Sequence, residues 1–191
     1  MSAEKTRSPR SPADGDAERN ADRLSNAGAT PDPWEECARL DYGGDRSFAW
    51  SVREQVLATP PEGRAQVEAR LLKALAVPAC TDAGRAFLCQ MLALVGSVKS
   101  LPVLAPLLRD PKSTEAARYA LQPIPGPEVS AALREALGAL TGNAKAGLIG
   151  TIAWRRDTTA RAVLAAIREN PAEPAIVREA ANRALDHLTV A

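Results

Sequence analysis

The chain has 191 residues, of which 46% are hydrophobic and 25% are charged, a balance typical of globular proteins and not of disordered or fibrous ones. Its 24 Lys and Arg residues nearly cancel its 23 Asp and Glu residues, so the formal net charge is +1 and provides no strong field for nucleic acid or an anionic membrane. We therefore expect neither a nucleic-acid partner nor a membrane. Aromatic residues make up only 4% of the chain and alanine is abundant, so the composition predicts an all-α protein.

The cysteines, the histidine and the glycines argue against a metal site or a bound cofactor. Cys37, Cys80 and Cys89 form no CxxC pair, and His187 is the single histidine of the chain, which excludes zinc and covalently attached haem. The glycines are scattered through helical sequence and form no phosphate loop or dinucleotide-binding turn. The odd number of widely spaced thiols indicates a reducing compartment, and the first thirty residues lack the apolar run of a signal peptide or anchor. We expect a cytoplasmic protein.

Two regions are expected from the change in sequence pattern. Residues 1–32 hold five basic and six acidic residues, and Leu24 is their one large aliphatic residue after Met1, which is too little apolar surface to offset the entropy of ordering. This stretch is predicted to be a disordered N-terminal tail. From Pro33 onward, apolar residues recur at spacings of three and four, which predicts a single helical domain over 33–191.

Short helices with tight turns are predicted along this domain, because Pro, Gly, Asp or Asn interrupts the apolar pattern every dozen or so residues. Thr81, Ser113 and Pro127 are placed to begin three of them, as residues suited to a helix N-terminus. The predicted helices span residues 33–40, 46–58, 61–76, 82–95, 98–109, 113–122, 127–140, 143–155, 158–169 and 173–188.

A helix, a tight turn and a second helix recur about every thirty residues when the chain is compared with itself. Shifts of 29 and 31 residues align the core positions of successive helices. The aligned sets are Leu88 with Ala117 and Leu148, Leu92 with Leu121 and Ile152, Leu104 with Leu133 and Leu164, and Leu108 with Leu137. Such a period is typical of a helical solenoid, in which each helix pair buries its apolar face against its neighbours. Three repeats cover 81–169, residues 46–76 form a degenerate first repeat, and 173–188 is a final capping helix.

These repeats resemble the short HEAT-like repeats of bacterial proteins, the subclass that is also found in phycobilisome lyases. The resemblance spans residues 46–188 and rests on a turn glycine, a proline and leucines in the second helix, and a closing aspartate, which here are Gly96, Pro102, Leu104, Leu107, Leu108 and Asp110. It implies a right-handed α-solenoid of about four helix pairs plus a capping helix. It says little about function, because such repeats serve scaffolds, lyases and some DNA-repair proteins alike.

The most distinctive cluster, Trp154, Arg155, Arg156 and Asp157, lies at the turn of the fourth repeat, where Arg155–Asp157 stand in place of the usual glycine. In a functional interpretation, the tryptophan and two exposed arginines grip an acidic or aromatic group of a partner, since Trp and Arg dominate interface hot spots. In a structural interpretation, Trp154 fills the gap between repeats, Asp157 caps the next helix, and the arginines pair with acids. If both arginines are exposed, replacing them should cost the fold little.

Two other sets of residues are open to the same pair of interpretations. Arg118 and Tyr119, in the preceding repeat, are either binding residues or structural ones. Cys89 lies between Leu88 and Leu92 on a predicted buried face, so it is predicted to be a core residue and not a nucleophile.

Two functions from different classes follow. The first is a non-enzymatic, monomeric HEAT-repeat scaffold or adaptor that binds another protein or peptide on a concave face lined by the second helices. The alternative is a HEAT-like enzyme, a chromophore lyase or a DNA glycosylase, with Trp154 as a stacking group and Asp157 or a nearby Glu as the acid. The near-zero net charge argues against the DNA enzyme, and the shortage of aromatic residues argues against a pocket for a large planar ligand.

Overall fold

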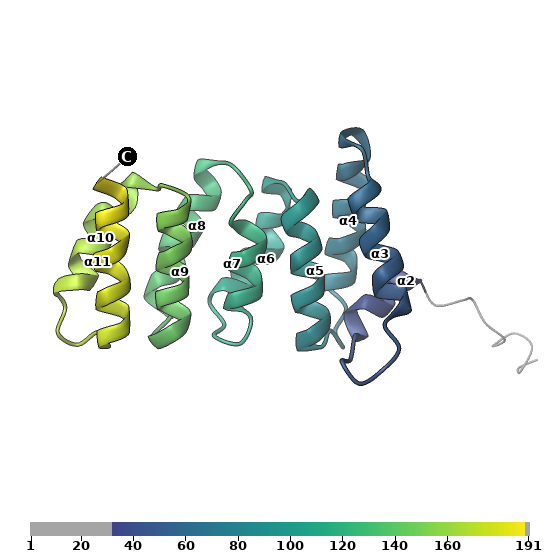
Figure 1. Cartoon of the computed structure of the whole chain (residues 1–191), viewed down its shortest axis with the longest axis horizontal. Helices are drawn as coiled ribbons and strands as arrows, with labels where there is room; N and C mark the ends of the chain where they lie inside the picture. The colour runs from purple at the N-terminus through teal and green to yellow at the C-terminus, as the bar shows by residue number, and fades with distance from the viewer. Residues whose placement is uncertain (1–31, 190–191) are drawn as a thin grey trace, which may run out of the picture. The chain divides into compact units, whose positions relative to one another are not determined.

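The computed structural model describes residues 32–189, and within this range it is built of helices without strands (Figure 1). The prediction of an all-α protein is confirmed for this part of the chain. The predicted disordered tail, residues 1–32, lies outside the described residues except for Asp32.

The helices follow one another with short connections. The α-helices are α2 (Pro33–Glu36), α3 (Ser47–Ala58), α4 (Arg64–Leu75), α5 (Asp82–Val95), α6 (Leu101–Leu108), α7 (Thr114–Leu121), α8 (Pro127–Ala136), α9 (Gly142–Trp154), α10 (Arg161–Glu169) and α11 (Ala175–Thr189). Short 3₁₀ segments adjoin several of them: η1 (Cys37–Arg39), η2 (Pro61–Gly63), η3 (Val98–Ser100), η4 (Leu137–Ala139) and η5 (Thr158–Ala160).

The predicted helix ranges match these elements closely, and the main difference lies at their ends. The predicted helices 61–76, 98–109 and 158–169 each begin with a 3₁₀ turn and continue as α4, α6 and α10. Tightened terminal turns of this kind supply partners to main-chain groups that the α-helix leaves unpaired. The spacing of apolar residues therefore locates the helices, but it does not distinguish the tighter first turn.

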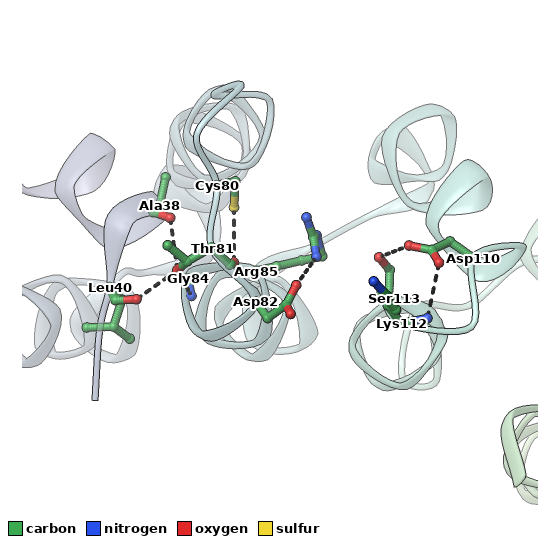
Figure 2. Close-up of polar contacts among 10 residues, drawn as sticks. All are labelled: Ala38, Leu40, Cys80, Thr81, Asp82, Gly84, Arg85, Asp110, Lys112 and Ser113. Atoms are coloured by element: carbon green, nitrogen blue, oxygen red, sulfur yellow. Dashed lines mark hydrogen bonds and ion pairs between the residues drawn. The ribbon is translucent and has the colours of Figure 1, made fainter. Parts of the chain in front are cut away.

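Of the three residues that were predicted to begin helices, two act as predicted and one does not. The Thr81 hydroxyl accepts a hydrogen bond of 2.9 Å from the Gly84 amide at the start of α5, and Pro127 is the first residue of α8. The Ser113 side chain makes no capping bond to α7. Its hydroxyl instead donates to the Asp110 carboxylate at 2.6 Å, as Figure 2 shows.

Helices alternate between two layers in this part of the chain. The helices α5, α7, α9 and α11 pack side by side in chain order, while α6, α8 and α10 lie behind them in the view of Figure 1. Within the rear layer α6 contacts α8, and across the layers α6 packs on α7 and α10 on α11. Each helix therefore packs mainly against elements that are near to it in the sequence.

The core forms where the repeated apolar positions meet. All the aligned positions of the predicted core are at most 2% exposed: Leu88, Leu92, Leu104, Leu108, Ala117, Leu121, Leu133, Leu137, Leu148, Ile152 and Leu164. Their burial confirms the helix faces expected from the sequence. None of the helices within residues 32–189 combines the length and the apolar character needed to cross a membrane.

A close approach of main chains fixes the start of α5 against η1. The Thr81 hydroxyl donates to the Leu40 carbonyl at 2.7 Å, and the Thr81 amide donates to the Ala38 carbonyl at 2.8 Å (Figure 2). A β-carbon on Gly84 would lie 2.3 Å from the Ala38 oxygen, so no larger residue fits here without a shift of the main chain. The N-terminal helices are thereby joined to the α5–α11 layer.

A buried carboxylate organises the next connection. Glu68 of α4 is only 3% exposed and accepts hydrogen bonds from the Ser97 amide at 2.8 Å and the Ser100 hydroxyl at 2.6 Å. These bonds satisfy a carboxylate that would be costly to bury alone, and they hold the turn before α6.

Candidate functional site

The Trp154–Asp157 turn ends α9 in a motif that helices commonly close with glycine. The Arg156 amide donates to the Ala153 carbonyl at 2.9 Å, and the Asp157 amide donates to the Ile152 carbonyl at 3.2 Å. This pair of bonds requires a left-handed residue after the helix, and Arg156 takes that conformation with φ of 54°. It is the one non-glycine residue with positive φ within the described range, so an arginine occupies a position where glycine costs less.

Arg155 is part of the fold and not of an exposed arginine pair. Its guanidinium group donates to four main-chain carbonyls and to one hydroxyl of the preceding turn: those of Leu121, Gln122, Ile124, Gly126 and Ser130. Burial lowers the pKa of this guanidinium, while Asp157 opposes the shift. The expectation that both arginines are exposed is wrong for Arg155, and so is the structural alternative in which it pairs with an acid. Its acceptors are carbonyl groups of a proline-rich turn that the sequence does not place near it.

Asp157 also has a structural partner. Its side chain is buried, pairs with Arg134 of α8, and makes no capping bond to the following turn η5. The expectation that Asp157 caps the helix after it is therefore wrong. Because the Asp157 carboxylate is paired with Arg134, Asp157 is not the free acid that the enzymatic alternative requires.

Trp154 and Arg156 remain on the surface. The Trp154 side chain is 59% exposed, so the structural interpretation in which it fills the gap between repeats is wrong. Arg156 is exposed, and its side chain makes no hydrogen bond or ion pair to any other residue of the described range. Together they present a large aromatic group and an unpaired cation on one turn.

Two hollows flank Trp154. The larger, of about 580 Å³, lies between the α7–α8 turn and the start of α10 and is also bordered by Arg134, Arg156 and Thr159. The smaller, of about 340 Å³, lies between α9 and α11 and is bordered by Ala180, Arg183 and His187. Pockets for small molecules are lined mainly by apolar and aromatic groups, whereas the larger hollow is lined by prolines, hydroxyls and charged groups around a single aromatic ring. Such a lining suits a polypeptide better than a small apolar ligand.

Arg118 and Tyr119 of α7 have opposite environments. The Arg118 guanidinium pairs with Glu115 and donates to the Thr151 hydroxyl of α9 at 3.1 Å, so it joins two neighbouring helices. Tyr119 is 52% exposed and borders a third hollow, of about 240 Å³, between α5 and α7. Of the six residues proposed from the sequence, Trp154, Arg156 and Tyr119 are available to a partner, while Arg118, Arg155 and Asp157 hold helices together.

The thiol and imidazole groups form no catalytic pair in the described residues. Cys89 is fully buried, as predicted, and burial raises the pKa of its thiol to about 12, so the thiol is protonated at neutral pH. His187 is exposed on α11, where it borders the same hollow as Trp154. No cluster of three or more His, Cys, Asp or Glu side chains within residues 32–189 is arranged to hold a metal ion.

Another exposed aromatic group, which was not predicted from the sequence, lies on α3 and in the loop before it. Trp50 is 62% exposed and Tyr42, in the preceding loop, is 68% exposed. The signal is present in the pattern of α3, because its buried residues Ala49, Val52 and Val56 form one stripe that excludes Trp50. A tryptophan beside the apolar stripe of an amphipathic helix is expected to face solvent or a partner.

Comparisons with protein-family models, with curated proteins and with solved structures gave no match for this chain.

Proposed function

We propose that this chain is a non-enzymatic adaptor, a right-handed α-solenoid of about four HEAT-like helix pairs with a capping helix that binds another protein or peptide. In this proposal residues 33–191 form the solenoid domain and the protein acts as a monomer, without a cofactor. The cytoplasm is its proposed location, in keeping with the thiols of Cys80 and Cys89, which form no disulfide bond.

The solenoid proposal is supported by hydrogen bonds that join residues about one predicted period apart. Ser97 binds Glu68 at a separation of 29 residues, and Thr151 binds Gln122 at the same separation. Lys145, only 7% exposed, pairs with a glutamate 28 residues later, at position 173. Polar links between neighbouring units, one repeat apart, are expected where each unit contacts mainly its neighbours.

The binding surface is assigned to the α7 and α9 side, which differs from the second helices expected from the sequence. Tyr119 and Trp154 lie at the ends of α7 and α9, the first helices of their predicted pairs. None of the large exposed aromatic side chains within residues 32–189 lies on α6, α8 or α10. Since exposed Trp and Tyr are the usual anchors of protein interfaces, the first-helix layer is the better candidate.

The observation that carries the proposal is the pairing of an exposed Trp154 with a strained, unpaired Arg156. A left-handed arginine costs the fold free energy relative to glycine, and strain of this kind persists where the surrounding structure or function requires the residue. The Arg156 side chain has no partner within the described residues that would offset the cost of this conformation. A guanidinium group beside a tryptophan ring offers a partner peptide a carboxylate-binding group and an apolar contact.

The proposal is tested with the full chain against a phage-displayed library of random sixteen-residue peptides. Affinities of enriched peptides are then measured for the wild type, for Trp154→Ala and for the control Leu94→Ala, which removes an exposed apolar side chain that borders neither proposed site. We expect a family of peptides that Trp154→Ala weakens by more than about tenfold, or about 1.4 kcal/mol, and that the control leaves unchanged. Selection without a consensus, or a set of enriched peptides of which none is weakened by Trp154→Ala, would overturn the proposed site.

A further inference from the structure

A hollow of about 240 Å³ lies at the N-terminal end of the domain, between the loop before α3, α3 itself and α5. Its lining includes Tyr42, Trp50, Phe87 and Met91 together with the arginines Arg46 and Arg53. Tyr42 and Trp50 are two of the most exposed aromatic side chains in the described residues. Folding gains little from rings that stay in water, so their gathering around one hollow points to a role in recognition.

The size of the hollow argues for a side chain as its occupant. Pockets for small molecules and cofactors span about 300–1,000 Å³ and enclose most of the ligand. At about 240 Å³ this hollow lies below that range, and it has room for one large side chain of a polypeptide. Its rings and the Met91 side chain form an apolar surface suited to an aromatic or large aliphatic anchor.

The charges around the hollow argue for an acidic partner. Arg46 and Arg53 are exposed and form no ion pair or hydrogen bond to other side chains in the described range, and no acidic residue lines the hollow. The nearby carboxylate of Asp45 is engaged at the start of α3, where it accepts a bond of 2.8 Å from the Ser47 amide.

Three arginines on α5, α7 and α11 differ from Arg46 and Arg53, because each has an acidic partner on its own helix. Arg85 of α5 pairs with Asp82 at 2.8 Å, and Arg118 of α7 and Arg183 of α11 each pair with a glutamate about one turn away. Arg46 and Arg53 have no such acidic partner, and they line one hollow that has no acidic residue in its lining. These two guanidinium groups are therefore available to carboxylates supplied by a partner.

We infer that this hollow is a second docking site, which takes an acidic linear peptide through one aromatic or large aliphatic anchor residue flanked by Asp or Glu. The anchor packs between the Trp50 and Tyr42 rings, and the flanking carboxylates bind Arg46 and Arg53. The site rests on its own residues and does not depend on the proposed site at Trp154. With a formal net charge of +1 and two arginines at the hollow, the chain favours a peptide over a single-stranded nucleic acid, although aromatic rings with arginines are also used to stack bases.

The test uses fluorescein-labelled nine-residue peptides and the full chain, with binding followed by fluorescence anisotropy. One peptide has a central Trp flanked by glutamates, a second has the same Trp flanked by lysines, and a third has a central Ala flanked by glutamates. We expect the first peptide to bind more than about tenfold more tightly than either of the others. A labelled dT oligonucleotide of similar length serves as the competing probe, and we expect it not to bind detectably at 150 mM salt.

Variants then locate the site. Trp50→Ala and the double change Arg46→Glu with Arg53→Glu should each weaken the first peptide by more than about tenfold, while Ile176→Ala, at an exposed residue outside both proposed sites, should leave it unchanged. Because all three positions are exposed, unchanged melting temperatures will show that the fold is retained. Equal binding of the Glu-flanked and Lys-flanked peptides, no effect of Trp50→Ala, absence of peptide binding, or binding of the oligonucleotide alone would each overturn the inference. A dimer in sedimentation equilibrium that Trp50→Ala dissociates would also overturn it, since a second copy would then cover the hollow.

Discussion

Arg155 Nη1 donates a hydrogen bond of 2.8 Å to the main-chain oxygen of Gln122, which lies 33 residues earlier in the chain. The same guanidinium group reaches the Gly126 carbonyl through Nη2 at 3.2 Å. These carbonyls belong to the turn between α7 and α8, where Pro123, Pro125 and Pro127 lack the N–H groups that would otherwise serve as donors. The side chain that follows α9 therefore supplies donors to the main chain of the preceding turn.

The first prediction is that Arg155→Ala destabilises the fold. Removing the guanidinium takes from the Gln122 and Ile124 carbonyls the donor that they have in the wild type, so the free energy of unfolding should fall by at least about 2 kcal/mol in urea titrations. Arg156→Ala is the matched control, since it removes an exposed arginine with no internal partner and should change stability by less than about 0.5 kcal/mol. Equal effects of the two substitutions would contradict the role assigned to Arg155.

A second prediction concerns the left-handed residue at the end of α9. Arg156→Gly should raise the free energy of unfolding by about 1 kcal/mol, because glycine has no β-carbon and adopts φ of 54° without a steric clash. If Arg156 is a binding residue, the same change should weaken peptides selected through the Trp154 site by more than about tenfold. Asn, which tolerates this conformation better than most residues, should give an intermediate stability. A loss of stability with glycine would show that the arginine side chain supports the fold.

The third prediction tests the repeat register. Leu104 of α6 and Leu133 of α8 are both fully buried, at positions that the repeat register predicts to be equivalent, so alanine at either should cost about 2 to 5 kcal/mol through lost burial and a cavity. Leu94 is 46% exposed on α5 and provides a control for which the loss should stay below about 1 kcal/mol. Losses below about 1 kcal/mol at both core leucines would mean that the predicted repeat register is wrong.

The sequence predicts the helices and their buried faces well because both depend on local spacing. Leu92, Leu121 and Ile152 are assigned to the core from periodicity alone, and each is fully buried. Thr81 is likewise identified as a helix start from its own neighbours. Such features require only that residues a few positions apart share a face.

The roles of Arg155 and Arg156 could not be separated in this way. The two residues are identical and adjacent, yet one enters the preceding turn and the other points to solvent. The direction of each side chain depends on the left-handed conformation of Arg156 and on carbonyl acceptors about thirty residues earlier, and the local sequence pattern indicates neither. The burial of Glu68 was not predicted for the same reason, because its hydrogen-bond donors, the Ser97 amide and the Ser100 hydroxyl, lie 29 and 32 residues away in the sequence.

The last prediction concerns the pH dependence of stability through Cys89. Burial raises the pKa of this thiol from its ordinary value of 9.0 to about 12, so the folded state retains the proton at pH values where the unfolded state has lost it. The resulting stabilisation is complete below about pH 9 and is lost as the pH rises from about 9 toward 12. Urea titrations at pH 8 and pH 11 should show a larger loss of stability for the wild type than for Cys89→Ala, in which all other titrating groups are retained. The same pH dependence in both proteins would mean that the Cys89 thiol ionises equally in the folded and unfolded states.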